Sequence, residues 1–181
     1  MKIGILGGTF DPFHIADAAI VKQALTKVNK VIIVPTVCNY YRKEKEPLFS
    51  FDNRVRIIRD FVAGITGNVE IDTVEKGKDS KWRYINTLEY IKKNYPNDEL
   101  FTIIGEDSYN KFDTWFRYDE ILSLSKLMVV NRSKNFAPTK YNAQLLRIDG
   151  MENVSSSKIR ERLLDELIDM YLSDREAYAS N

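Results

Sequence analysis

The sequence KIGILGGTFDPFH, residues 2–14, decides the fold class of this chain. Residues 2–6 form a short Ile-rich apolar run that two glycines stop, which predicts a buried β-strand. In residues 15–28 the apolar positions fall three and four apart, which predicts a helix with one buried stripe. Residues 30–35, KVIIVP, predict a second strand that ends at its proline. Together these elements make a unit whose parallel crossover is right-handed.

The same alternation continues through the rest of the chain. Apolar patterns predict further strands at residues 69–74, 100–104 and 127–130, helices at residues 51–62, 82–95 and 118–125, and one or two helices at residues 156–172. Strands that alternate with helices of this length are typical of a doubly wound parallel sheet with helices on both faces. We therefore predict a single Rossmann-like α/β domain over residues 1–181 that ends in a C-terminal helical segment.

Composition narrows the function classes. Hydrophobic residues make up 44% of the 181 positions and charged residues 29%, which excludes a disordered or fibrous chain. The 27 Lys and Arg residues against 26 Asp and Glu give a net charge of +1, so we expect no nucleic-acid partner. The lone Cys38 and the lone His14 exclude a disulfide framework, a cysteine-rich zinc site and a multi-histidine metal site. Since neither a membrane-spanning stretch nor a signal peptide is recognisable, we expect no membrane partner and a cytoplasmic protein.

The loop after the first strand is the first candidate site, because ligands of an open parallel sheet bind beyond the carboxyl ends of its strands. Paired glycines let backbone N–H groups approach a ligand, and the following helix directs its positive end at the same space, which suits a phosphate. His14 and Asp17 share a face at the start of that helix. Taken alone, the glycines also suit a tight turn, and they match neither GxGxxG nor a phosphate loop ending in Gly-Lys-Ser/Thr.

A more specific signal is the whole string of residues 7–14, GGTFDPFH, which resembles the N-terminal signature of the nucleotidylyltransferase superfamily. Residues 105–108, GEDS, followed by Trp115, and residues 153–160, NVSSSKIR, are similar to two further segments of that superfamily. The three matches occur in the family's order over nearly the full length. Within the superfamily, the chain most resembles the nicotinate/nicotinamide-nucleotide adenylyltransferases.

The resemblance implies an enzyme of NAD biosynthesis that uses ATP, accompanied by Mg²⁺, and nicotinate or nicotinamide mononucleotide. In that reaction an acceptor phosphate oxygen attacks the α-phosphorus of ATP and expels pyrophosphate. Because the nucleophile is already anionic, catalysis consists of positioning and of neutralising charge on the phosphates. The residues that the resemblance assigns to ATP are Gly8, Thr9, Phe10, His14, Gly105, Asp107, Ser156, Ser157 and Arg160, with His14 and Arg160 counted as catalytic.

Several of these residues also have a plain structural explanation. The three serines at 155–157 suit the N-cap of the C-terminal helix, and Asp107 suits a turn. Trp115 resembles the tryptophan that stacks on the pyridine ring of the acceptor, but as an isolated aromatic it suits the core. Arg42 lies at the place of a basic residue that holds the acceptor phosphate, while a surface-loop arginine is ordinarily solvated.

The chain departs from the family signature at Asp17, where the family has a second histidine. A carboxylate beside a triphosphate has the wrong sign unless a cation intervenes. Asp17 is therefore a candidate catalytic residue that ligates or orients the Mg²⁺. Alternatively, the chain is a nucleotide-binding protein with weak or no catalysis.

A second departure concerns the acceptor. Where deamido members of the family usually carry Ser-Tyr-Thr, this chain has Trp82, Arg83 and Tyr84. Arg83 is able to pair with a carboxylate and Trp82 to stack on a ring, although both also suit the start of an amphipathic helix. These changes leave open which pyridine form is the acceptor, or whether the acceptor is a different molecule. The sequence also leaves the oligomeric state open, homo-oligomers included.

Overall fold

A computed structural model of the chain describes residues 1–37, 46–79, 81–131, 133–150 and 153–179. In these residues six strands form one sheet, and every neighbouring pair is parallel. The order across the sheet is β3-β2-β1-β4-β5-β6. The strands are β1 (Lys2–Gly8), β2 (Lys30–Pro35), β3 (Val69–Ile71), β4 (Glu99–Gly105), β5 (Lys126–Val130) and β6 (Gln144–Leu146).

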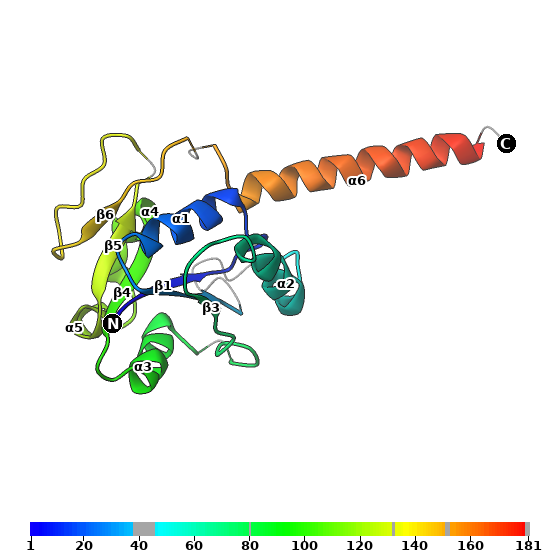
Figure 1. The fold of residues 1–181 in the computed structure, drawn as a ribbon. Coiled ribbons are helices and arrows are strands. Elements are labelled where there is room, and N and C mark those ends of the chain that lie inside the picture. Colours follow the sequence, from blue (N-terminus) through cyan, green and yellow to red (C-terminus); the bar gives the residue numbers. More distant parts are fainter. Residues whose placement is uncertain (38–45, 80, 132, 151–152, 180–181) are drawn as a thin grey trace.

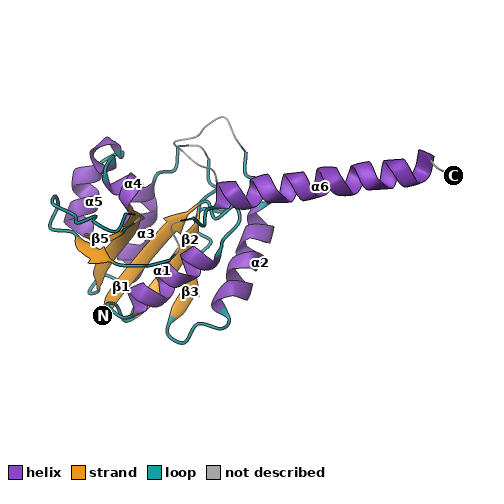
Figure 2. Ribbon diagram, turned by 90° about the horizontal axis from the view of Figure 1, so that it is seen from above, coloured by secondary structure: helices purple, strands orange, loops and turns teal. Residues whose placement is uncertain are grey.

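Helices cover both faces of this sheet (Figure 2). On one face lie α1 (Ile15–Leu25) and α2 (Phe51–Val62), and on the other lie α3 (Tyr84–Asn94) and α5 (Tyr118–Leu124). The short α4 (Glu106–Tyr109) and a 3₁₀ turn (Phe112–Thr114) follow β4 directly. The last helix, α6 (Ser156–Ala179), begins at the end of the sheet where α1 begins and extends away from the rest of the molecule (Figure 1).

The strands are buried on both faces, as their continuous apolar runs predict. Along β2, Val31 and Ile33 pack into the cluster under α1 and α2, while Ile32 and Val34 pack into the cluster under α3 and α5. This alternation fixes the register of the sheet, because a shift by one residue would exchange the two faces.

The predicted fold class is confirmed, with the element boundaries shifted by a few residues. The strand predicted at residues 69–74 ends earlier, at Ile71, because the Asp72 carboxylate accepts the N–H of Val74 at 2.8 Å and turns the chain. The C-terminal helix is longer than predicted. The edge strand β6 and the short α4 were not predicted, since each is too short to show a period in the sequence.

The strand order places a switch point beside β1. From β1 the chain winds outward through β2 to β3, whereas β4 lies on the opposite side of β1. The connections therefore diverge at the carboxyl ends of β1 and β4, which opens a crevice for a ligand. Among the described helices, none has both the length and the apolar character that crossing a membrane requires.

Candidate active site

A cavity of about 970 Å³ opens at this switch point. This volume is at the upper end of the range of small-molecule sites, about 300–1,000 Å³. Its walls come from the loop after β1, the start of α1, the end of β4, the start of α3, the segment after β4 and the first turns of α6. Of the predicted site residues, those that line the cavity are Gly8, Thr9, Phe10, His14, Asp17, Arg83, Tyr84, Gly105, Asp107, Trp115, Ser156, Ser157 and Arg160.

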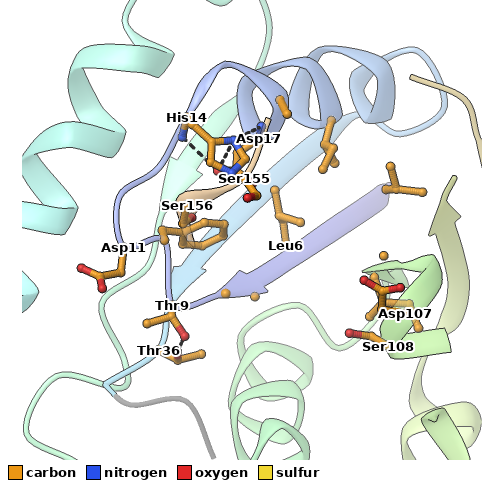
Figure 3. A pocket seen from close by; sticks show the side chains of 18 of the residues that line it. Leu6, Thr9, Asp11, His14, Asp17, Thr36, Asp107, Ser108, Ser155 and Ser156 are labelled. Atoms are coloured by element: carbon orange, nitrogen blue, oxygen red, sulfur yellow. Dashed lines mark hydrogen bonds and ion pairs between the residues drawn. The ribbon is translucent and has the colours of Figure 1, made fainter. Parts of the chain in front are cut away.

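Among the polar side chains, two groups lie on opposite sides of the cavity, apart from Asp11, Thr9 and Thr36 (Figure 3). His14 and Asp17 at the start of α1 lie beside Ser155 and Ser156 at the start of α6. Asp107 lies across the cavity, after the end of β4. The first group brings together residues that are about 140 positions apart in the sequence, which only the folded chain could show.

His14 and Asp17 are joined at the N-terminus of α1. His14 is the N-cap residue, and its Nδ1 accepts the backbone N–H of Asp17 at 3.3 Å. In return, Oδ2 of Asp17 accepts the backbone N–H of His14 at 2.9 Å and lies 3.1 Å from its Nδ1. This reciprocal pair is a capping box, with the unusual feature that an imidazole takes the place of a hydroxyl. The Asp17 carboxylate thus has a structural partner before any ligand binds.

The start of α6 is held against the loop after β1. Ser156 donates its hydroxyl to the carbonyl of Pro12 at 2.9 Å, and Arg160 donates to the carbonyl of Asp11. The Arg160 guanidinium also donates to Oγ of Ser157 at 3.1 Å and lies 3.6 Å from the Asp11 carboxylate. The N-terminus of α6, with its positive end and the Arg160 charge, therefore faces the same cavity as the glycine loop.

Sequence reasoning missed Asp11 as a residue that shapes the site. Its buried carboxylate accepts the backbone N–H groups of Leu48 and Phe49, each at 2.9 Å, and so ties the segment before α2 to the glycine loop. No local pattern could reveal this role, because both donors lie more than 35 positions away.

Aromatic and polar groups form the wall near α3. The Tyr84 and Trp115 rings meet edge to face with centroids 5.4 Å apart, and Trp115 also packs on Phe112. Tyr84 donates its hydroxyl to Thr102 at 2.9 Å, and burial raises the pKa of Tyr84, so that this hydroxyl stays neutral. Arg83 lines the cavity while one of its Nη atoms donates to the carbonyl of Trp82 at 3.0 Å.

Comparison with known proteins gives the same result as the motifs. Residues 5–162 match the cytidylyltransferase-like family model. The chain is 31% identical over 192 residues to the "Probable nicotinate-nucleotide adenylyltransferase" of Halalkalibacterium halodurans, covering 99% of this chain and 92% of the relative. A protein of the same name from Aliarcobacter butzleri is 31% identical over 167 residues, covering 90% of this chain and 88% of the relative.

The chain belongs to the nicotinate-nucleotide adenylyltransferase family, within the cytidylyltransferase-like proteins. A solved structure supports the fold of the chain. The "Plasmodium falciparum nicotinic acid mononucleotide adenylyltransferase complexed with APC" is similar with a TM-score of 0.73 and 17% identity, covering 88% of this chain and 82% of that one. The family resemblance that the motifs predicted is thereby confirmed, and with it the enzyme class, nucleotidyltransferase.

Two of the predicted acceptor residues are not among the described residues that line the cavity. Arg42 lies outside the described residues. Trp82 is not part of the cavity lining, and its indole N–H instead donates to Oγ1 of Thr87 at 2.8 Å. Thr87 in turn donates to the buried Glu75 at 2.8 Å, so Trp82 is bonded into the packing under α3.

Proposed function

We propose that this chain transfers the adenylyl group of ATP to nicotinate mononucleotide, or to its nicotinamide form, in NAD biosynthesis. An oxygen of the acceptor phosphate attacks the α-phosphorus of ATP. The bond from that phosphorus to the oxygen bridging to the β-phosphate breaks, so that a dinucleotide forms and pyrophosphate leaves. The observation that carries the proposal is the joining of the first and last family signatures by the Ser156–Pro12 and Arg160–Asp11 hydrogen bonds beside one cavity.

The wall formed by the glycine loop and α6 suits the triphosphate of ATP. Backbone N–H groups of residues 8–10 and the N-termini of α1 and α6 offer donors and positive dipole ends. His14 and Ser157 add side-chain donors, and Arg160 adds a full charge with a bidentate fork. Ser156 would donate to a phosphate only by turning its hydroxyl away from the Pro12 carbonyl. Such preorganised donors stabilise the charge that shifts onto the leaving pyrophosphate. Gly105 and Asp107, after β4, are assigned to the adenylate part.

The opposite wall suits the acceptor. We assign the Trp115 ring to stack on the pyridine ring, with Tyr84 packed against its edge. Arg83 lines the same cavity and supplies the one charge type that favours a nicotinate carboxylate over a nicotinamide. The nicotinate form is therefore the acceptor that we expect this chain to prefer.

Mg²⁺ fits this site best as a companion of ATP. Within the described residues, no group of three or more His, Cys, Asp and Glu side chains is arranged to hold a metal ion. The carboxylate of Asp17 faces the cavity and is the candidate to orient the ion, while its Oδ2 already accepts the His14 N–H. When bound, Mg²⁺ would neutralise phosphate charge. We expect residues 1–181 to act as one catalytic domain in the cytoplasm, as a monomer or a homo-oligomer.

The decisive experiment measures pyrophosphate release from ATP with nicotinate mononucleotide and nicotinamide mononucleotide in parallel, each with and without Mg²⁺. Release that depends on an acceptor, with the matching dinucleotide identified by mass, supports the proposal. The ratio of the two rates gives the preferred acceptor, and the metal-free wells test the need for Mg²⁺. Absence of release with both acceptors contradicts it.

The identity of residue 17, an aspartate, favours a second candidate function. Because a carboxylate takes the place of the second histidine of the family signature, a nucleotide-binding protein with weak or no catalysis is the alternative, as is a transferase with another acceptor. Calorimetric binding of ATP without pyrophosphate release from either mononucleotide would favour this alternative. A screen of other phosphate-bearing acceptors would then separate its two forms.

A further inference from the structure

Arg54 is a buried cation that the proposed reaction does not use directly. It belongs to α2, its residue is 1% exposed, and it is not part of the cavity lining. Removing a guanidinium from water is costly unless its N–H groups find partners. The hydrogen bonds of a buried arginine must therefore offset this cost, and the groups that they hold indicate its role.

The partners of Arg54 include backbone carbonyls from three separate segments. Its Nη1 donates to the carbonyl of Thr9, in the glycine loop, and to that of Thr36, after β2, at 2.8 Å. Its Nε donates to the carbonyl of Phe49, before α2, at 3.2 Å, and its Nη2 to that of Val37 at 3.3 Å. One planar side chain thus clamps the loop after β1 to both ends of the segment between β2 and α2.

The bond to Thr9 has a consequence on the far side of the same peptide. In a trans peptide the carbonyl and the following N–H point in opposite directions. Arg54 holds the Thr9 carbonyl and is not part of the cavity lining, so the N–H of Phe10 points away from Arg54 in a loop whose Thr9 and Phe10 line the cavity. Phe10 has a φ of 49°, a conformation that a bulky residue adopts only when its surroundings hold it.

We propose that Arg54 is a positioning residue for ATP: by holding the Thr9 carbonyl it presents the Phe10 N–H to the phosphates. The same clamp ties this peptide to the carbonyls of Thr36, Val37 and Phe49. The inference rests on the proposed function only in that ATP is the ligand of the glycine loop. It requires no turnover, because the effect acts on binding.

The test compares Arg54→Lys and Arg54→Met with Arg56→Lys and Arg56→Met, which change an exposed arginine of the same helix. Thermal unfolding first establishes the temperature range in which each variant is folded. Within that range, calorimetry gives the Kd for ATP, and steady-state kinetics give kcat and KM separately. We expect both Arg54 variants to bind ATP at least tenfold more weakly, with Lys less affected than Met, and both Arg56 variants to match the wild type.

Folded Arg54 variants with an ATP Kd within twofold of the wild type would overturn the inference and leave Arg54 a purely structural residue. If neither variant folds, the wild-type protein still provides a test, because the Phe10 amide is expected among the largest ¹⁵N–¹H shifts when ATP is added. An unshifted Phe10 amide under saturating ATP overturns the inference. A wild type that binds ATP without turnover contradicts the proposed reaction alone, whereas a wild type that does not bind ATP contradicts both.

Discussion

The Asp17 carboxylate lies 3.1 Å from Nδ1 of His14 and accepts the backbone N–H of the same residue at 2.9 Å. Asp17, which departs from the family signature, is therefore hydrogen-bonded to His14, which matches it. The departure is not an isolated negative charge in an anion site. It fixes both the start of α1 and the position of the one imidazole in the chain.

Removing this carboxylate should weaken the helix start and the site together. We expect Asp17→Ala to lower the free energy of unfolding by about 1 kcal/mol, the usual worth of a capping interaction, and to lower kcat. Urea titration and steady-state kinetics measure the two effects. Asp17→Asn keeps an acceptor for the His14 N–H and should recover most of the lost stability, so an Asn variant as unstable as Ala would contradict the capping role.

Restoring the family residue with Asp17→His tests the same position in the other direction. Because the wild-type carboxylate holds His14, we expect this variant to lose activity rather than gain it. The comparison is kcat/KM for ATP at saturating acceptor. A clear gain in rate would mean that Asp17 marks a weakened site, in keeping with the alternative of a nucleotide binder.

We expect the loss of Arg160 to lower kcat more than it lowers the stability of the fold. Arg160→Ala removes a charge and a bidentate fork from the triphosphate wall, and loss of one such donor typically costs about 2.7–4 kcal/mol, or a 10²–10³-fold fall in kcat. The matched control is Arg162→Ala, which removes an exposed arginine from the same helix. Steady-state rates of Arg160→Ala equal to those of Arg162→Ala would remove Arg160 from the catalytic group.

The acceptor preference should follow the charge of Arg83. Arg83→Gln removes the cation that we assign to the nicotinate carboxylate, so kcat/KM for nicotinate mononucleotide should fall about tenfold or more. The value for nicotinamide mononucleotide should change little. Arg59→Gln, at an exposed position of α2, controls for a general effect of charge. An equal fall in kcat/KM with both acceptors would indicate that Arg83 stabilises the protein structure and does not bind the nicotinate carboxylate.

Gly8 leaves no room for a side chain. A methyl group built there would lie 2.9 Å from two carbons of the Phe10 ring, so Gly8→Ala forces Phe10 out of its place in the loop. Overpacking of this kind costs about 1–3 kcal/mol of stability, and the displaced loop should bind ATP more weakly. Gly64→Ala is the control, because nothing lies within 4 Å of a methyl group at that position. Calorimetry gives the Kd for ATP. An unchanged Kd in Gly8→Ala would contradict the predicted displacement of the loop.

Asp72 should make stability depend on pH. Desolvation by burial, the largest effect, and the nearby Glu70 charge raise the pKa of Asp72, although its bond from the Val74 N–H opposes the shift. The folded state therefore binds the proton more tightly than the unfolded state, and the corresponding stability is lost as pH rises above the usual carboxyl range. We expect Asp72→Asn to be more stable than the wild type at pH 7, with the difference vanishing at pH 3. Urea titrations at both pH values check this, with the exposed Asp60→Asn as a control.

The sequence predicts the sheet well because its strands are buried on both faces and because helices such as α2 and α3 show one apolar stripe. These are local signals. The order of the strands, the switch point beside β1 and the edge strand β6 depend on pairings between distant segments, and no local pattern carries them. β6 has three residues, which is too few for a period to emerge.

The candidate site likewise contains residues that local sequence patterns predict and residues that depend on contacts between distant segments. Residues of the glycine loop and the serines before Arg160 could be predicted because they belong to contiguous signatures. Asp11 and Arg54 could not, because their partners are backbone groups of remote segments. Trp82 shows the reverse case: the sequence places it next to Arg83, yet its side chain is bonded to Thr87 outside the cavity lining.

The docking of α6 on the glycine loop also has a consequence for biosynthesis. The ribosome makes the loop of residues 7–14 and all six strands before it makes Ser156 and Arg160. A nascent chain can therefore contain its whole sheet while half of the proposed triphosphate wall is still missing. We therefore expect a message cut short in that region to yield a chain that has its sheet but lacks Ser156 and Arg160, and with them the contacts to ATP that we propose.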